Sequence, residues 1–163
     1  MNVLGKKESV NGSTSMDLFD IKKIIVAVDL SPHSEKTATY AASFAKNVGA
    51  SITLLHIFPP EPSEEFASEG VYQSFEQGRW LLAQKLVDLA DQVRRTGVKC
   101  EYDFQVGDPA EEVARSAKDL HADLVITAAH HPGFLGRLLG MDQASRILHR
   151  AGCPVLVYHE GNE

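Results

Sequence analysis

The segment KKIIVAVDLSPHSEKTATYAASFAKNVGASITLLHI, residues 22–57, decides the fold. It begins and ends with short continuous apolar runs, IIVAVD and ITLLHI, which are typical of strands buried on both faces of a parallel sheet. Between them, Ser31 followed by Pro32 predicts the start of a helix, and Gly49 predicts its end. A strand, a helix and a second strand in this order predict a crossover unit with two parallel strands.

Three further runs of this kind follow along the chain, separated by helix signals. Asp108, Pro109 and Glu111 predict a capping box at the start of one helix. Because strands alternate with helices, we expect one α/β domain with a doubly wound, five-stranded parallel sheet and helices on both faces. The five predicted strands are residues 24–29, 52–57, 100–106, 123–128 and 154–159.

The longest predicted helix runs from about Val71 to Arg95 and stops at Gly97. Its apolar residues recur at helical spacing, and we expect this stripe to face the core. The preceding residues, 59–70, are predicted to be the only long loop inside the domain. The stripe consists of Leu81, Leu82, Leu86, Leu89 and Val93.

The composition of the 163 residues, 44% hydrophobic and 23% charged, fits a single globular domain. A net charge of -6 argues against broad binding to nucleic acid, which needs a basic face. No apolar stretch approaches the roughly 20 residues of a membrane span. Cys100 and Cys153 are too few for a secreted disulfide framework, so we expect a cytoplasmic protein. Residues 1–20 are expected to be a disordered leader or a cloning remnant, followed by a folded domain over residues 21–160.

The carboxyl ends of the strands mark the predicted site, because open doubly wound sheets bind ligands there, where the strand order reverses. Val28 and Asp29 end the first strand, Ile57 ends the second, and Thr127 and Ala128 end the fourth. A glycine-bearing loop then leads into a helix, an arrangement that can hold a phosphate group. We therefore predict a small-ligand site at this end of the sheet.

Three stretches of the chain resemble the universal stress protein family: residues 22–57, 107–128 and 137–158. The resemblance implies an adenine-nucleotide alpha hydrolase-like fold with strand order 3-2-1-4-5 and a homodimer formed through the last strand. It also implies binding of ATP or AMP, with Mg²⁺ only where ATP binds. Nothing in the sequence resembles a Walker loop or a nucleophile elbow, so we expect a stress-response protein that is not an enzyme.

The resemblance assigns roles to the residues at the strand ends. It implies that Asp29 binds ribose or adenine, while Val28 and Ile57 supply apolar walls for the base. Structural alternatives stay open, since Asp29 can cap the turn into the first helix and the two apolar residues can pack in the core. His56 is expected to be a hydrogen-bonded structural histidine.

The loop after the fourth strand departs from the family's phosphate-binding pattern, G-x2-G-x9-G-[ST]. With the pattern aligned on Gly140, its hydroxyl position falls on Met141, and its first two positions fall on residues other than glycine. Gly133 and Gly136 keep the G-x2-G spacing, but they lie closer to Gly140 than the nine intervening residues of the family's loop require. The loss removes backbone amides that can approach a phosphate closely. The residues at the first two positions are Thr127 and His130, or Ala128 and His131 if one residue is deleted.

Two further features of this loop bear on a ligand. Asp142, in the first turn of the next helix, would repel a phosphate there, and Arg137 would offset part of that repulsion. The adjacent His130 and His131 suggest a metal site, but neighbours in an extended chain point to opposite faces and cannot easily share one ion. We expect no metal, and we expect the two histidines to line the mouth of the crevice.

The last strand is expected to lie at the sheet edge and to bind a second copy of the chain. A long apolar edge is prone to aggregation, and antiparallel pairing with the same strand of a partner covers it. Two functions therefore stay open. The first is a module that binds an adenine nucleotide weakly, and the second is a homodimeric interaction or regulatory protein whose ancestral ATP pocket is lost. The residues expected at the dimer interface are Val155, Leu156, Val157 and Tyr158.

Overall fold

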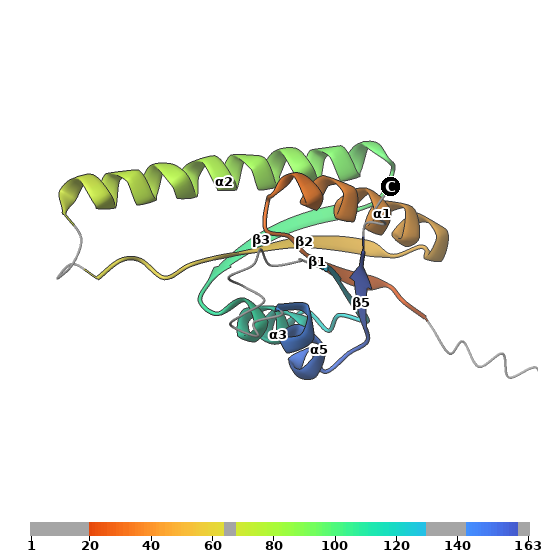
Figure 1. Ribbon diagram of the computed structural model, residues 1–163. Coiled ribbons are helices and arrows are strands. Elements are labelled where there is room, and N and C mark those ends of the chain that lie inside the picture. Colours follow the sequence, from red (N-terminus) through yellow and green to blue (C-terminus); the bar gives the residue numbers. More distant parts are fainter. Residues whose placement is uncertain (1–19, 64–67, 130–142, 160–163) are drawn as a thin grey trace, which may run out of the picture.

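The computed structural model describes residues 20–63, 68–129 and 143–159, so the predicted leader stays a prediction. Its five-stranded sheet has the order β3-β2-β1-β4-β5 with every pair parallel, which confirms the predicted fold class and strand order (Figure 1). The elements are β1 (Lys23–Ala27), α1 (Pro32–Val48), β2 (Ser51–Phe58), α2 (Glu69–Arg95), β3 (Cys100–Val106), α3 (Pro109–Asp119), β4 (Leu124–Ala128), α5 (Gln143–Arg150) and β5 (Val155–Tyr158).

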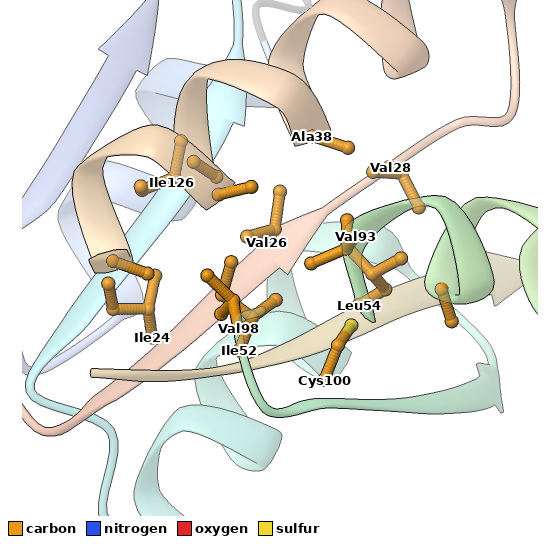
Figure 2. Packing of buried hydrophobic residues seen from close by; sticks show 14 of the residues in the cluster. Ile24, Val26, Val28, Ala38, Ile52, Leu54, Val93, Val98, Cys100 and Ile126 are labelled. Atoms are coloured by element: carbon orange, nitrogen blue, oxygen red, sulfur yellow. The ribbon is translucent and has the colours of Figure 1, made fainter. Parts of the chain in front are cut away.

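The helices lie in two layers, with α1 and α2 on one face of the sheet and α3 and α5 on the other (Figure 1). Successive residues of the central strand β1 point to opposite layers. Val26 belongs to the cluster that also holds Ala38 of α1 and Val93 of α2 (Figure 2). Ile25 instead packs with Val113 of α3 and Ile147 of α5. Burial on both faces explains why the strand sequence is a continuous apolar run.

The helix α1 begins and ends where the sequence predicts, but its cap differs in chemistry. Gly49 ends the helix with a φ of 73°, a left-handed conformation that glycine adopts without steric cost. Ser31 occupies the N-cap position, yet its own hydroxyl makes no capping hydrogen bond. Instead, Asp29 Oδ1 accepts hydrogen bonds from the Ser31 N–H (3.0 Å) and the Ser34 hydroxyl (2.7 Å).

Two predictions about α2 are wrong. The helix starts at Glu69, so the last two residues assigned to the preceding loop are helical. Leu81 is 56% exposed and does not share the buried stripe of Leu86, Leu89 and Val93. Five residues separate Leu81 from Leu86, and this spacing places the two side chains about 140° apart around a helix.

The prediction for β3, Cys100–Val106, is confirmed at both ends, whereas boundaries of the other strands differ from the predicted ones by one or two residues. β1 ends at Ala27, so Val28 and Asp29 follow the strand, whereas β2 continues to Phe58. The last strand is shorter than predicted and comprises Val155–Tyr158. The end of β1 is poorly marked in the sequence because the buried apolar residues continue past it, to Val28 and Leu30.

The edge strand β5 leaves backbone groups open. The Ala129 N–H donates to the Tyr158 carbonyl (2.7 Å), so the even-numbered residues of β5 bond to β4. Alternate residues of a parallel strand bond to the same neighbour, and the N–H and C=O groups of Val155 and Val157 therefore point away from the sheet. In the described part of the chain, no side chain bonds to these outward groups.

The opposite edge strand, β3, is partly protected by side chains of the same molecule. Its odd-numbered residues bond to β2, so the backbone groups of its even-numbered residues point outward. Arg94 Nε donates to the outward carbonyl of Cys100 (2.8 Å). The outward N–H of Phe104 donates to Oδ1 of the neighbouring Asp103 (2.9 Å). Side chains of the same molecule thus occupy part of this edge.

Candidate functional site

A cavity of about 330 Å³ lies at the carboxyl ends of β1, β2 and β4, where the strand order reverses. Its volume is at the lower end of the roughly 300–1,000 Å³ that is usual for small-molecule sites. Most of its wall is apolar, with a few hydroxyl, imidazole and carboxylate groups. The described residues that line it are Ala27, Val28, Asp29, Ser34, Thr37, Leu55, His56, Ile57, Pro109, Val113, Thr127, Ala128, Ala144 and Ile147.

The structure brings together all the strand-end residues that the sequence assigns to the site: Val28, Asp29, Ile57, Thr127 and Ala128 line one cavity. The structural alternative is seen as well, because Val28 is also a member of the buried core and Ile57 packs against the cluster on the other face of the sheet. The other predicted site residues lie outside the described residues. They are His130, His131, Gly133, Gly136, Gly140 and Met141.

Asp29 has both a structural and a site-facing position. Its Oδ1 atom caps the turn into α1 through Ser31 and Ser34, and its side chain lines the cavity. The next residue, Leu30, has a φ of 60° and a buried side chain. This left-handed conformation costs a residue other than glycine about 1–2 kcal/mol. The strained turn places Leu30 in the core while Asp29 stays at the cavity.

His56 is held in one orientation by the chain itself. Its Nδ1 atom lies 2.8 Å from the Val28 carbonyl oxygen, and its ring packs edge-on against Phe58 at 4.8 Å between centroids. A carbonyl can only accept a hydrogen bond, so Nδ1 carries a proton. The bond confirms the predicted structural role. Nε2 is buried with no hydrogen-bond partner among the described residues.

Several lining residues were missed by reasoning from strand ends. Ser34 and Thr37 belong to the first turns of α1, Pro109 is the first residue of α3, and Ala144 lies in the first turn of α5. In a strand–helix–strand unit, each of these helices begins beside the carboxyl end of the preceding strand. The signal that could have found them was therefore the helix-start pattern, already visible at Ser31 and Asp108.

An ion pair links α3 to α5 beside this cavity. Asp108 caps α3 by accepting hydrogen bonds from the backbone N–H groups of Ala110 and Glu111, and it also accepts two from Arg146. Burial raises the pKa of the Asp108 carboxyl, but the hydrogen bonds from Arg146 and from the two backbone N–H groups outweigh burial and lower the pKa overall.

The described residues offer little to a metal ion. Within residues 20–63, 68–129 and 143–159, no group of three or more histidine, cysteine, aspartate or glutamate side chains is arranged to hold one. The helices in these ranges also include none with the length and apolarity that crossing a membrane requires. Among the described residues, the cavity has mostly apolar walls, and its polar lining residues are Asp29, His56, Ser34, Thr37 and Thr127.

Comparison with known proteins gives a consistent result. A family model described as the universal stress protein family matches residues 20–159. Among curated proteins, a universal stress protein from Thermus aquaticus is 29% identical over 137 residues, which cover 83% of this chain and 97% of that protein.

Two solved structures have the same fold. A universal stress protein in complex with cAMP gives a TM-score of 0.69 at 22% identity and covers 87% of this chain and 99% of that one. A universal stress protein family protein from Arabidopsis thaliana with AMP bound gives a TM-score of 0.63 at 18% identity, and the match covers 86% of this chain and 92% of that one. At these identities, the similarity concerns the fold alone.

Proposed function

We propose that this chain, which belongs to the universal stress protein family, binds the adenosine part of an adenine nucleotide in the cavity at the ends of β1, β2 and β4. One observation carries the proposal: residues from three strands, including Asp29, Ile57 and Thr127, converge on one apolar cavity of ligand size. The two proteins of the same fold that were solved with cAMP and AMP support the choice of an adenine ligand.

The described lining residues suit a nucleoside better than a phosphate. Apolar side chains, among them Val28 and Ile57, provide walls for a base, and the Asp29 carboxylate can accept hydrogen bonds from ribose hydroxyls. None of the described lining residues is a lysine or an arginine, so the phosphates extend beyond this part of the wall. We therefore propose weak binding of AMP or ATP, with Mg²⁺ only alongside ATP.

Substitutions at Asp29 test the proposal, because they separate the capping of the turn into α1 from the proposed contact with the ligand. Asp29→Asn keeps an oxygen that can accept from Ser31 and Ser34, so the cap is retained, but it removes the charge. Asp29→Ala removes both. We expect calorimetric titration with AMP to show at least about a tenfold weaker affinity in both variants, which is the usual effect of a lost charged hydrogen bond.

The thermal midpoint distinguishes this role from a purely structural one. It should fall in Asp29→Ala, since loss of a helix cap costs about 1 kcal/mol, and should stay near wild type in Asp29→Asn. Unchanged AMP affinity in Asp29→Asn, or a wild-type protein that binds no adenine nucleotide at millimolar concentration, would refute the proposed role of the cavity.

We also propose that two copies associate through β5, as antiparallel partners across a two-fold axis. The outward backbone groups of Val155 and Val157 support this, because they need partners that the described part of the chain does not supply. The same open edge favours a second candidate function, in which the protein is a homodimeric interaction or regulatory module and the cavity has lost its ligand. In either case we propose a cytoplasmic stress-response protein without catalytic residues.

A further inference from the structure

The ion pair between Asp108 and Arg146 joins two helices that meet at the cavity. Arg146 Nη2 donates to both carboxylate oxygens of Asp108, at 3.0 Å and 2.9 Å. The two residues are 38 positions apart in the sequence. About a third of each side chain is exposed, so the pair is only partly screened by solvent. A charge-assisted contact of this kind fixes direction as well as distance.

The pair lies directly behind the cavity wall. Asp108 precedes Pro109, and Arg146 lies beside Ile147 in the helix that also carries Ala144, and these three neighbours all line the cavity. The apolar packing of α3 on α5, through residues such as Val113, is not directional and tolerates small sliding movements. The directional contact between Asp108 and Arg146 adds a fixed register to this packing.

A second ion pair between the same helices serves as an internal comparison. Arg150 Nη1 donates to Glu111 Oε1 (2.9 Å), one helical turn farther along both α3 and α5. Neither residue lines the cavity, and both side chains are at least half exposed. An exposed pair contributes little, so it should not hold the cavity wall.

We infer that Asp108 and Arg146 are a positioning pair for the nucleotide site: they hold α3 against α5 so that the cavity keeps the shape that accepts the adenosine. The inference rests on the proposed function of the cavity. It predicts that losing the pair loosens the wall and weakens binding, although neither residue lines the cavity.

Two variants break the pair in different ways. Arg146→Met keeps the aliphatic stem and removes the charge, whereas Asp108→Asn keeps an oxygen that can cap α3. Glu111→Gln is the matched control, because it breaks the outer ion pair of the same two helices. Calorimetric titration with AMP gives the affinity. Methyl NMR signals of Val113 and Ile147 report on the wall without any ligand.

We expect each single variant to raise the Kd for AMP about tenfold, and the double variant to raise it no further, because both remove one shared contact. The methyl signals of Val113 and Ile147 should shift in both variants, and Glu111→Gln should change the Kd less than twofold. Two results would overturn the inference. One is a double variant in which the losses of AMP affinity add up. The other is that Arg146→Met and Asp108→Asn match Glu111→Gln in both the Kd for AMP and the methyl signals. A wild type that binds no AMP would instead refute the proposed function, and the methyl signals would then decide alone whether the pair holds the wall.

Discussion

The two edges of the sheet differ in how they treat the backbone groups that face outward. On β3, Arg94 and Asp103 bond to the outward groups of Cys100 and Phe104. On β5, the outward groups of Val155 and Val157 have no such partner in the described part of the chain. Apolar side chains are exposed on both edges, Tyr102, Phe104 and Val106 on β3 and Val157 on β5, so apolarity alone does not single out β5. The bonds from side chains to the β3 backbone are the difference, and they support the proposal that β5 is the edge that receives a second strand.

This difference supports β5 as the site of the proposed dimer interface, independently of the resemblance to a family. A strand that approaches β3 would have to displace hydrogen bonds already made within the chain, and breaking each of these without replacement costs free energy. A strand that approaches β5 finds open donors and acceptors and an apolar surface.

The largest expected effect comes from placing a charge on the open edge. Val157 is 41% exposed on β5, and Val106 is 44% exposed on β3, so the two valines form a matched pair. Val157→Lys should raise the dimer dissociation constant about 100-fold, because two buried ammonium groups repel each other across the axis. Val106→Lys should leave the dimer unchanged.

Sedimentation equilibrium measures both variants against wild type. A wild-type dimer that survives Val157→Lys but dissociates in Val106→Lys would reverse the assignment of the two edges. Equal weakening by both substitutions would show that backbone capping does not control association.

An intermediate effect should follow when the protected edge is opened. Asp103→Ala removes the acceptor for the outward Phe104 N–H and leaves an apolar strand with a free edge. We expect light scattering to detect a concentration-dependent mass above that of the dimer. Asp103→Asn keeps an acceptor oxygen and should behave as wild type. If Asp103→Ala stays at the mass of the wild type at all concentrations, the cap has no protective role.

The sequence predicts some of these features and cannot predict others. Apolar runs and helix signals such as Ser31-Pro32 depend on near neighbours, so the elements of the central sheet are visible in the chain. Strand-end residues such as Asp29 and Thr127 follow from the topology, because parallel strands end on the same side. The resemblance to a family added the strand order, which local patterns do not contain.

Other features depend on contacts between distant residues. The Asp108–Arg146 pair and the bond from Arg94 to Cys100 need the folded arrangement, and no periodicity marks them. Leu81 is a different case: its exposure follows from its spacing of five residues to Leu86, about 140° around the helix, which the sequence itself contains.

The smallest expected effect concerns the amino end of the sheet, where Asp123 bonds to the backbone beside β1 rather than to either edge strand. Asp123 Oδ2 accepts hydrogen bonds from the backbone N–H groups of Lys22 and Lys23, both at 2.9 Å, and these bonds lower the pKa of the carboxyl. The folded state therefore binds a proton less readily than the unfolded chain. The stabilisation is complete above the ordinary aspartate pKa of 3.8 and is lost as the pH falls through the lowered value.

Asp123→Asn should therefore lower the free energy of unfolding by about 1 kcal/mol near neutral pH and by less in acid. Urea denaturation at several pH values gives these free energies, and Asp119→Asn controls for the loss of one acidic group. An equal loss at all pH values would contradict the linkage. The dimer dissociation constant should not change, because β5 is not involved.

Native mass spectrometry of the freshly purified protein tests association through β5 and nucleotide binding in the cavity with one spectrum. We expect a species of twice 17.8 kDa that carries up to one adenine nucleotide per chain. A single bare chain of 17.8 kDa, unchanged after addition of millimolar AMP, would contradict it.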